Sequence, residues 1–170
     1  GLNKELSNVE HIILLGCGTS YYSACIGSKY MKKWCNFVSV QVFDAGEFTK
    51  FEIPKGKCAF IMVSQSGETK DLQKCIEIIQ GHITIGVINK VDSVIARQVD
   101  YVCYLNAGRE VGVASTKSFV SQVTLLSLIS LWFAQLQSGI QPDLNIIKDL
   151  IQLSTDIEDT LNINMKSYVH

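Results

Sequence analysis

Short apolar runs alternate with segments of helical spacing along the 170-residue chain. Each run has the length of a buried strand, and the segments between them repeat apolar residues every three or four positions. Strands are predicted at residues 11–16, 37–43, 58–63, 83–89 and 101–105. Helices are predicted at residues 20–34, 68–80, 92–98, 116–137 and 143–162. The pattern favours a three-layer α/β/α fold, with a five-stranded parallel sheet covered on both faces.

One predicted helix is unusual because residues 118–142 carry no charged side chain. Their length and composition would allow a membrane span. Hydroxyl and amide side chains recur along the segment, and a span would have to bury them in lipid or in a bundle. They belong to Ser121, Gln122, Thr124, Ser127, Ser130, Gln135 and Gln137. We therefore expect no membrane insertion, and predict a helix that packs on the sheet and against a partner. The amphipathic helix at 143–162 is predicted to dock through its apolar face.

The composition is that of one globular domain, with 47% hydrophobic and 18% charged residues. A net charge of −1 gives no electrostatic reason to expect nucleic acid or an anionic membrane as a partner. The six cysteines form no Cys-x-x-Cys pair and have no nearby histidine, so neither a zinc site nor any other metal is expected. With no secretory signal, the thiols are expected to be reduced and the protein to be cytoplasmic.

A cluster of small polar residues joins the strand predicted at 58–63 to the helix predicted at 68–80. It reads Ser64-Gln65-Ser66-Gly67-Glu68-Thr69, with three hydroxyls, one amide and no cation. Backbone N–H groups at a helix start are unpaired and lie at the positive end of the helix dipole, so they favour an anion. Hydroxyls can donate to the remaining oxygens, and a glycine lets the backbone come close. The turn is a candidate phosphate site; the alternative is a helix cap in which Glu68 completes a capping box.

Two further segments have the same character. The strand predicted at 11–16 runs into Gly16-Cys17-Gly18-Thr19-Ser20-Tyr21, and Val111-Gly112-Val113-Ala114-Ser115-Thr116-Lys117 leads into the helix predicted at 116–137. Because ligands of open parallel sheets bind at the carboxyl ends of strands, the three turns are predicted to line one crevice. Gly16-x-Gly18 with Asp44 is also a partial dinucleotide-binding fingerprint. Tyr21 stands where its third glycine is expected, which favours a sugar phosphate and no nicotinamide cofactor.

Three segments carry a resemblance to a known family. They are Cys17-Gly18-Thr19-Ser20, Ser64 to Thr69, and the stretch 108–117, which reads Gly-Arg-Glu-Val-Gly-Val-Ala-Ser-Thr-Lys. They resemble the signature segments of sugar isomerase (SIS) domains, and more narrowly those of the isomerase region of the glucosamine-6-phosphate synthase family, the glutamine–fructose-6-phosphate transaminases. The resemblance spans roughly residues 11–122 and implies a flavodoxin-like, Rossmann-like sheet. It implies a single SIS domain over 1–170, with a core at about 10–137 and a C-terminal helix at about 143–162.

The resemblance also implies a set of site residues and ligands. The phosphate of the sugar is expected to bind at Ser20, Ser64, Gln65, Ser66 and Thr69. The sugar itself is expected to contact Thr19, Val113 and Ser115. The implied ligands are fructose 6-phosphate, glucosamine 6-phosphate and glucose 6-phosphate. The phosphate role of the turn agrees with the argument from helix N-termini, whereas the sugar contacts rest on the resemblance.

No catalytic residue is carried onto this sequence by the resemblance. The family's proton-transfer residues (a Glu, a Lys, a His and a near-C-terminal Lys) lie in a second SIS half, and its glutaminase domain uses an N-terminal cysteine. Cys17, Glu68 and Lys117 are the alternatives within this chain, and structural roles are favoured for each. The chain alone is therefore predicted to be inactive. Its expected partners are the second SIS half and the glutaminase domain of the same protein, in a homo-oligomer.

Two functions stay open at this point. In the first, the chain is the sugar-phosphate-binding half of an enzyme that makes glucosamine 6-phosphate from fructose 6-phosphate and glutamine. In the second, it is a stand-alone regulatory SIS module that binds a phosphosugar without catalysis. The stretch 108–117 is the most specific of the three segments, and it favours the first.

Overall fold

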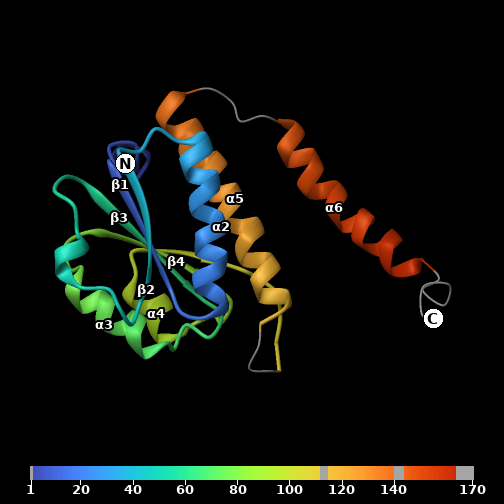
Figure 1. Ribbon diagram of the computed structural model, residues 1–170, viewed down its shortest axis with the longest axis horizontal. Helices are drawn as coiled ribbons and strands as arrows, with labels where there is room; N and C mark the ends of the chain where they lie inside the picture. The colour runs from blue at the N-terminus through green and yellow to red at the C-terminus, as the bar shows by residue number, and fades with distance from the viewer. Residues whose placement is uncertain (1, 112–114, 140–143, 164–170) are drawn as a thin grey trace. The chain divides into compact units, whose positions relative to one another are not determined.

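The chain divides into two compact units, residues 1–140 and residues 141–170. A computed structural model describes residues 2–111, 115–139 and 144–163 (Figure 1). The described part of the second unit is the helix α6 (Leu144–Asn162), in which no residue is buried. The first unit holds the sheet and the predicted site.

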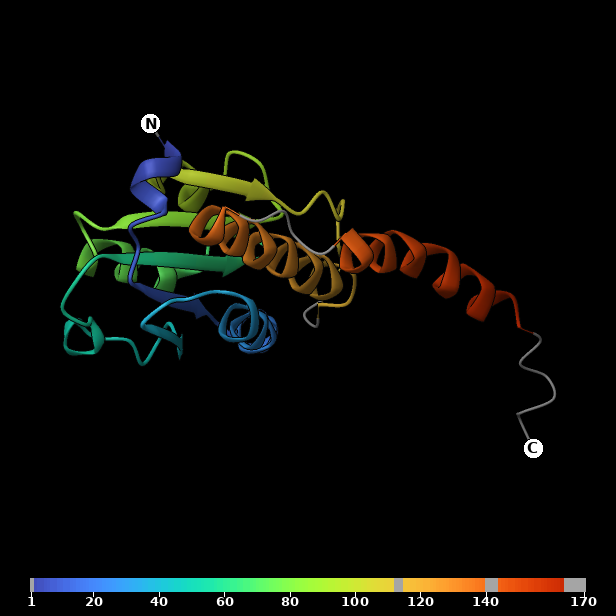
Figure 2. The ribbon, with the colours of Figure 1, turned by 90° about the horizontal axis from the view of Figure 1, so that it is seen from above.

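Five parallel strands form the centre of the first unit. They are β1 (His11–Gly16), β2 (Ser39–Asp44), β3 (Cys58–Ser64), β4 (Ile83–Ile88) and β5 (Tyr101–Tyr104). Their order across the sheet is β2-β1-β3-β4-β5, and Figure 2 shows the strands pointing the same way. The predicted five-stranded parallel sheet is confirmed. Because the chain moves from β1 to one edge and returns to β3 on the other side of β1, the order reverses between β1 and β3.

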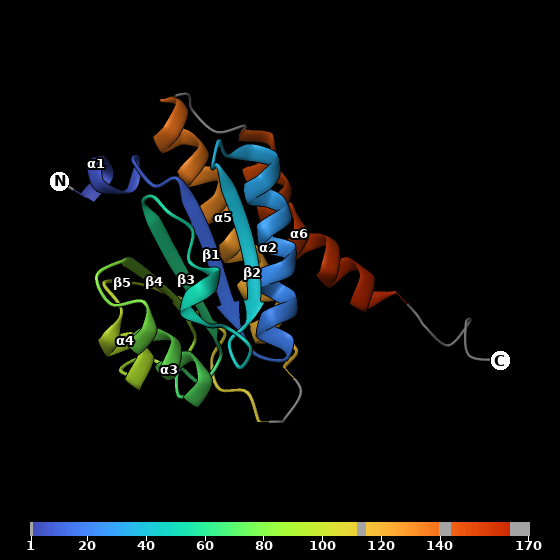
Figure 3. The same ribbon diagram turned by 60° about the vertical axis from the view of Figure 1, so that its left-hand side comes forward.

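Helices cover both faces of this sheet, as the three-layer prediction requires. On one face lie α1 (Leu2–Leu6), α2 (Thr19–Trp34) and α5 (Lys117–Ser138). On the other lie α3 (Lys70–Ile78) and α4 (Val94–Gln98), and Figure 3 shows the two layers with the sheet between them. A short 3-10 helix, η1 (Lys50–Glu52), precedes β3.

The core has two parts, one under each helical layer. Ile12 and Leu14 of β1 face the cluster shared with α2 and α5, while Ile13 and Leu15 face the cluster shared with α3 and α4. All residues of β1 and β3 are buried. Burial on both faces explains why these strands read as continuous apolar runs rather than as alternating patterns.

The apolar helix α5 buries part of its surface within the domain. By length and composition α5 is the one described helix that could span a membrane, with a mean hydropathy of 1.6. Leu126, Ile129 and Phe133 nevertheless belong to the buried cluster, and α5 packs along α2. Gly27 of α2 permits this close approach, since a Cβ added there would lie 2.9 Å from the Cβ of Leu126. The predicted packing of this helix on the domain is confirmed.

Some boundaries differ from the sequence-based ones. Helix α3 begins at Lys70 rather than at residue 68, because Gly67 adopts a left-handed φ of 62° and keeps the turn out of the helix. Helix α1 and η1 were not predicted. Five residues are too few to establish helical periodicity, and η1 is formed by a local capping box between Thr49 and Glu52.

Candidate functional site

A cavity of about 280 Å³ lies at the carboxyl ends of β1 and β3, where the strand order reverses. This is the place at which open parallel sheets bind their ligands. Its described lining residues are Cys17, Gly18, Thr19, Ser20, Val63, Ser64, Gln65, Ser66, Thr69, Glu110 and Ser115. The three polar turns of the sequence therefore line one crevice, as predicted. Of the eight predicted ligand-binding residues seven line it, and Val113 lies outside the described residues.

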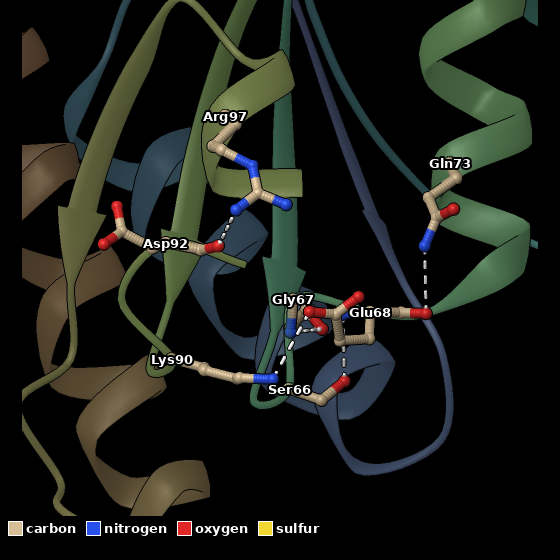
Figure 4. Close-up of polar contacts among 8 residues, drawn as sticks. Ser66, Gly67, Glu68, Gln73, Lys90, Asp92 and Arg97 are labelled. Carbon is tan, nitrogen blue, oxygen red and sulfur yellow. Dashed lines mark hydrogen bonds and ion pairs between the residues drawn. The ribbon is translucent and has the colours of Figure 1, made fainter. Parts of the chain in front are cut away.

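The turn after β3 is held in shape by its own hydroxyls. Ser64 Oγ accepts a hydrogen bond from the backbone N–H of Gly67 (2.9 Å) and lies 3.1 Å from Thr69 Oγ1. Ser66 Oγ accepts one from the backbone N–H of Glu68 at 3.2 Å, as Figure 4 shows. Gly67 is buried, and its positive φ is one that glycine adopts without strain. The chain folds back tightly enough to place both serines on the cavity wall.

The capping-box interpretation of this turn is wrong. Thr69 is the N-cap of α3 and makes no side-chain capping bond. Glu68 lies before the N-cap, and its Oε1 is 3.4 Å from Lys90 Nζ in an exposed ion pair (Figure 4). The N-cap of α2, Gly18, likewise lacks a side-chain capping bond. The starts of α2 and α3 thus carry no side-chain cap, although the N–H groups of Ser20 and Tyr21 in α2 donate to the carbonyls of Cys17 and Gly18. The positive ends of both helices lie beside the cavity, where they favour an anion.

The third helix at the cavity differs, because a carboxylate already occupies its N-terminus. Glu110 Oε1 accepts hydrogen bonds from the backbone N–H groups of Thr116 and Lys117, each at 2.8 Å. Hydrogen bonds from Ser118 and Thr116 hold the pKa of Glu110 at about 2, well below its ordinary value of 4.5. Ser115 Oγ also donates to Glu110, at 3.2 Å. An anionic ligand is therefore directed to α2 and α3 rather than to α5.

The loop that carries Glu110 is fixed to the sheet by Asn89, just after β4. Asn89 Oδ1 accepts from the backbone N–H of Ala107 (3.0 Å), and its Nδ2 donates to the carbonyl of Gly108 (2.7 Å). Lys117 Nζ donates to the carbonyl of Arg109 at 3.1 Å. Lys117 therefore closes this loop rather than entering the cavity, which agrees with its expected structural role.

Ser20, at the start of α2, is held by a side chain that the sequence did not assign to the site. Gln122 of α5 donates from Nε2 to Ser20 Oγ at 3.0 Å, and Ser23 Oγ lies 2.8 Å from Gln122 Oε1. The sequence places Gln122 among the amides of an uncharged helix and Glu110 within the stretch 108–117, and neither residue is predicted to belong to the site. The sequence does contain a signal for Gln122: an amide side chain in an apolar helix needs a hydrogen-bond partner if it is buried.

Cys17 is not activated by its position near the start of α2. Burial, with a further contribution from Asp44, raises the pKa of the thiol. A nucleophilic cysteine requires the opposite shift. Asp44 itself accepts from the backbone N–H of Gly46 at 2.9 Å, which fixes the turn after β2. Among the described residues no three His, Cys, Asp or Glu side chains gather in a way that could hold a metal ion.

Comparison with known proteins agrees with this geometry. A family model described as the SIS domain matches residues 5–131. A protein of Acanthamoeba polyphaga mimivirus, named as a probable glutamine–fructose-6-phosphate aminotransferase (isomerizing), is 51% identical over 126 residues, which are 72% of this chain and 21% of that protein. The Bacillus subtilis (strain 168) glutamine–fructose-6-phosphate aminotransferase (isomerizing) is 34% identical over 149 residues, which are 85% of this chain and 24% of that protein.

A solved structure gives the same result. The C-terminal domain of glucosamine-fructose-6-phosphate aminotransferase from Francisella tularensis superimposes with a TM-score of 0.76 at 26% identity. The match covers 91% of this chain and 44% of that one. The chain thus spans between a fifth and a quarter of the length of the two curated relatives it matches.

Proposed function

Because the chain belongs to the SIS domain family and matches the isomerase region of glutamine–fructose-6-phosphate aminotransferase, we propose that its cavity binds the phosphate of a hexose 6-phosphate. The phosphate lies between the starts of α2 and α3, and the sugar extends toward Ser115. Thr19 and Ser115, which line the cavity, contact the sugar.

One observation carries the proposal: three serine hydroxyls of the cavity, one at the start of α2 and two in the turn before α3, each accept a hydrogen bond from a protein donor. Ser64 accepts from Gly67, Ser66 from Glu68 and Ser20 from Gln122. A hydroxyl has a single hydrogen, so a serine that already accepts from the protein has that hydrogen left for a ligand. In the pair formed by Ser64 and Thr69, one hydrogen is used internally and one is left. Hydroxyls with a hydrogen left to donate suit a phosphate, whose ionised oxygens accept hydrogen bonds.

The whole protein's activity is a second step of the proposal. The curated relatives are named as aminotransferases that act on fructose 6-phosphate with glutamine, and this chain corresponds to less than a quarter of each. We propose that it supplies the phosphate-binding residues and part of the sugar pocket of such an enzyme. We further propose that the enzyme is cytoplasmic and self-associates. Acid–base residues and glutamine hydrolysis then belong to other parts of the polypeptide.

A regulatory module is the alternative, since no described residue of the cavity is a poised acid or base. The coding sequence that follows the codon of His170 distinguishes the enzyme from the regulatory module. A second SIS half there, bearing a Glu and a Lys on its helices, supports the enzyme; a stop codon supports the regulatory module.

The proposed binding of the phosphate by the serine hydroxyls is tested with the variant Ser66→Ala. Loss of one hydrogen bond to a charged group costs about 1.5–3 kcal/mol, which lowers affinity about 10- to 150-fold. Calorimetric titration with millimolar glucose 6-phosphate measures the effect, and glucose tests the need for the phosphate. Ser28→Ala is the matched control, because Ser28 is buried in α2, donates to the carbonyl of Cys25 and does not line the cavity.

Two results would contradict the proposal. One is an unchanged affinity of Ser66→Ala for glucose 6-phosphate. The other is glucose binding as tightly as its phosphate, which would place the recognition in the sugar and not in the serine hydroxyls.

A further inference from the structure

Gln122 is a fully buried polar side chain near the start of the apolar helix α5. Burial of an amide without hydrogen bonds is costly, so its position requires partners. Both ends of the amide find them on α2. Nε2 donates to Ser20 Oγ at 3.0 Å, and Oε1 lies 2.8 Å from the hydroxyl of Ser23, itself fully buried.

The contact with Ser20 has a direction. Ser20 lines the cavity, and its hydroxyl oxygen receives a hydrogen from Gln122. The single hydrogen of Ser20 therefore points away from the amide and is available to the cavity. With a carboxylate at position 122 the same hydroxyl would donate to α5 instead, and a lone pair of Ser20 would face the ligand.

The other end of the amide contacts Ser23, one turn further along α2. Ser23 Oγ lies 2.8 Å from both Gln122 Oε1 and the carbonyl oxygen of Ser20. Ser23 shares its single hydrogen between these two acceptors, and with Oε1 on Ser23 the Nε2 group of Gln122 faces Ser20. Ser23, Gln122 and Ser20 thus form a short chain of hydrogen bonds that starts in the core and ends at the cavity wall.

We propose that Gln122 is a positioning residue, which sets the direction of the Ser20 hydroxyl so that it donates to the ligand's phosphate. The inference rests on the proposed function, because it assigns a phosphate to the cavity. It gives α5, which contributes no predicted phosphate ligand of its own, a direct effect on phosphate affinity.

The experiment compares variants of this chain by calorimetric titration with glucose 6-phosphate. Gln122→Met keeps the shape and removes both hydrogen bonds; Gln122→Glu keeps the shape and replaces the donor by an acceptor. We expect about a 2- to 10-fold loss of affinity for the first, and for the second a loss as large as that of Ser20→Ala, about 10- to 150-fold. Ser28→Ala is the matched control, because it removes a buried hydroxyl of α2 that contacts neither the amide nor the cavity, and it is expected to change affinity less than about twofold.

The deciding measurement is a double-mutant cycle. If Gln122 acts through Ser20, then adding Gln122→Met to Ser20→Ala leaves the affinity unchanged. Thermal unfolding of each variant reports its folded fraction, and the cycle with the methionine variant decides the question if the buried glutamate prevents folding. A purely structural glutamine would lower stability without this dependence on Ser20.

Each outcome has one meaning. Full affinity in Gln122→Met and Gln122→Glu, with a loss in Ser20→Ala, overturns the inference and leaves the proposed function intact. An equal loss from Gln122→Met with and without Ser20 also overturns it. Absence of any binding of glucose 6-phosphate to the unmodified chain overturns the proposed function and the inference with it.

Discussion

Replacement of Gly67 by alanine is expected to destabilise the domain strongly, because two costs add at this position. The residue has a φ of 62°, a left-handed conformation that costs a residue with a Cβ about 1–2 kcal/mol. The new methyl would overlap Ser93 Oγ and lie 2.5 Å from Ser93 Cβ. Overpacking of a buried site costs about 1–3 kcal/mol more. The sum, about 2–5 kcal/mol, is a large part of the roughly 5–15 kcal/mol by which domains are stable.

Gly81→Ala separates the two costs. Gly81 has a φ of 86°, and a Cβ there meets no atom within 4 Å, so only the conformational cost applies. Urea unfolding followed by circular dichroism gives the free energy of unfolding of both variants. We expect Gly67→Ala to be less stable than Gly81→Ala by about 1–3 kcal/mol.

Ser93→Gly provides the rescue. It removes both Ser93 atoms that the new methyl would meet, and glycine is an acceptable N-cap for α4. The double variant is expected to regain most of the difference from Gly81→Ala. Equal stabilities of Gly67→Ala and Gly81→Ala, or a double variant no more stable than Gly67→Ala, would refute the close approach of Gly67 and Ser93 as the cause.

Two further predictions follow from charge and from exposed apolar surface. Because the pKa of Glu110 is lowered from 4.5 to about 2, its carboxylate stabilises the fold above about pH 4.5, and this contribution is lost as the pH falls toward 2. The difference in free energy of unfolding between the unmodified chain and Glu110→Gln should therefore shrink from pH 5 to pH 2.5 in urea titrations; a constant difference would contradict this. Self-association is expected because an apolar groove of about 350 Å³ beside β5 and α5 includes Leu128 and Trp132, 39% and 36% exposed. Sedimentation at increasing concentration measures it, and a monomer at every concentration that binds no hydrophobic dye would count against it.

The sheet was predictable from sequence because strands that are buried on both faces consist mostly of apolar residues. The central strands β1, β3 and β4 are short, mostly apolar runs, and the run from Cys58 to Val63 is buried throughout. The position of the cavity was predictable for a related reason. Polar turns that follow strands of a parallel sheet meet at one edge, so residues as far apart as Thr19 and Ser115 line the same space.

The details of the site depended on contacts that no local pattern records. Gln122 meets Ser20 across 102 positions of the chain, and only the packing of α2 against α5 brings them together. Glu68 fits a capping box in the sequence, but the left-handed Gly67 displaces the start of α3, and the carboxylate turns to Lys90 instead. Glu110, by contrast, does cap a helix although the sequence does not suggest it. Its hydrogen bonds to the start of α5 span six to eight residues, more than the three of a capping box.

The described wall of the cavity has no lysine or arginine, and this has a consequence for selectivity in salt solution. Attraction between separated charges is screened over about 8 Å at physiological ionic strength, whereas a hydrogen bond to a fixed hydroxyl depends on the placement of two atoms. The proposed phosphate site, built from Ser20, Ser64 and Ser66, would therefore select anions by the geometry of their oxygens rather than by total charge. Chloride, abundant but without oxygens to fit three separate donors, is a poor competitor for such a site.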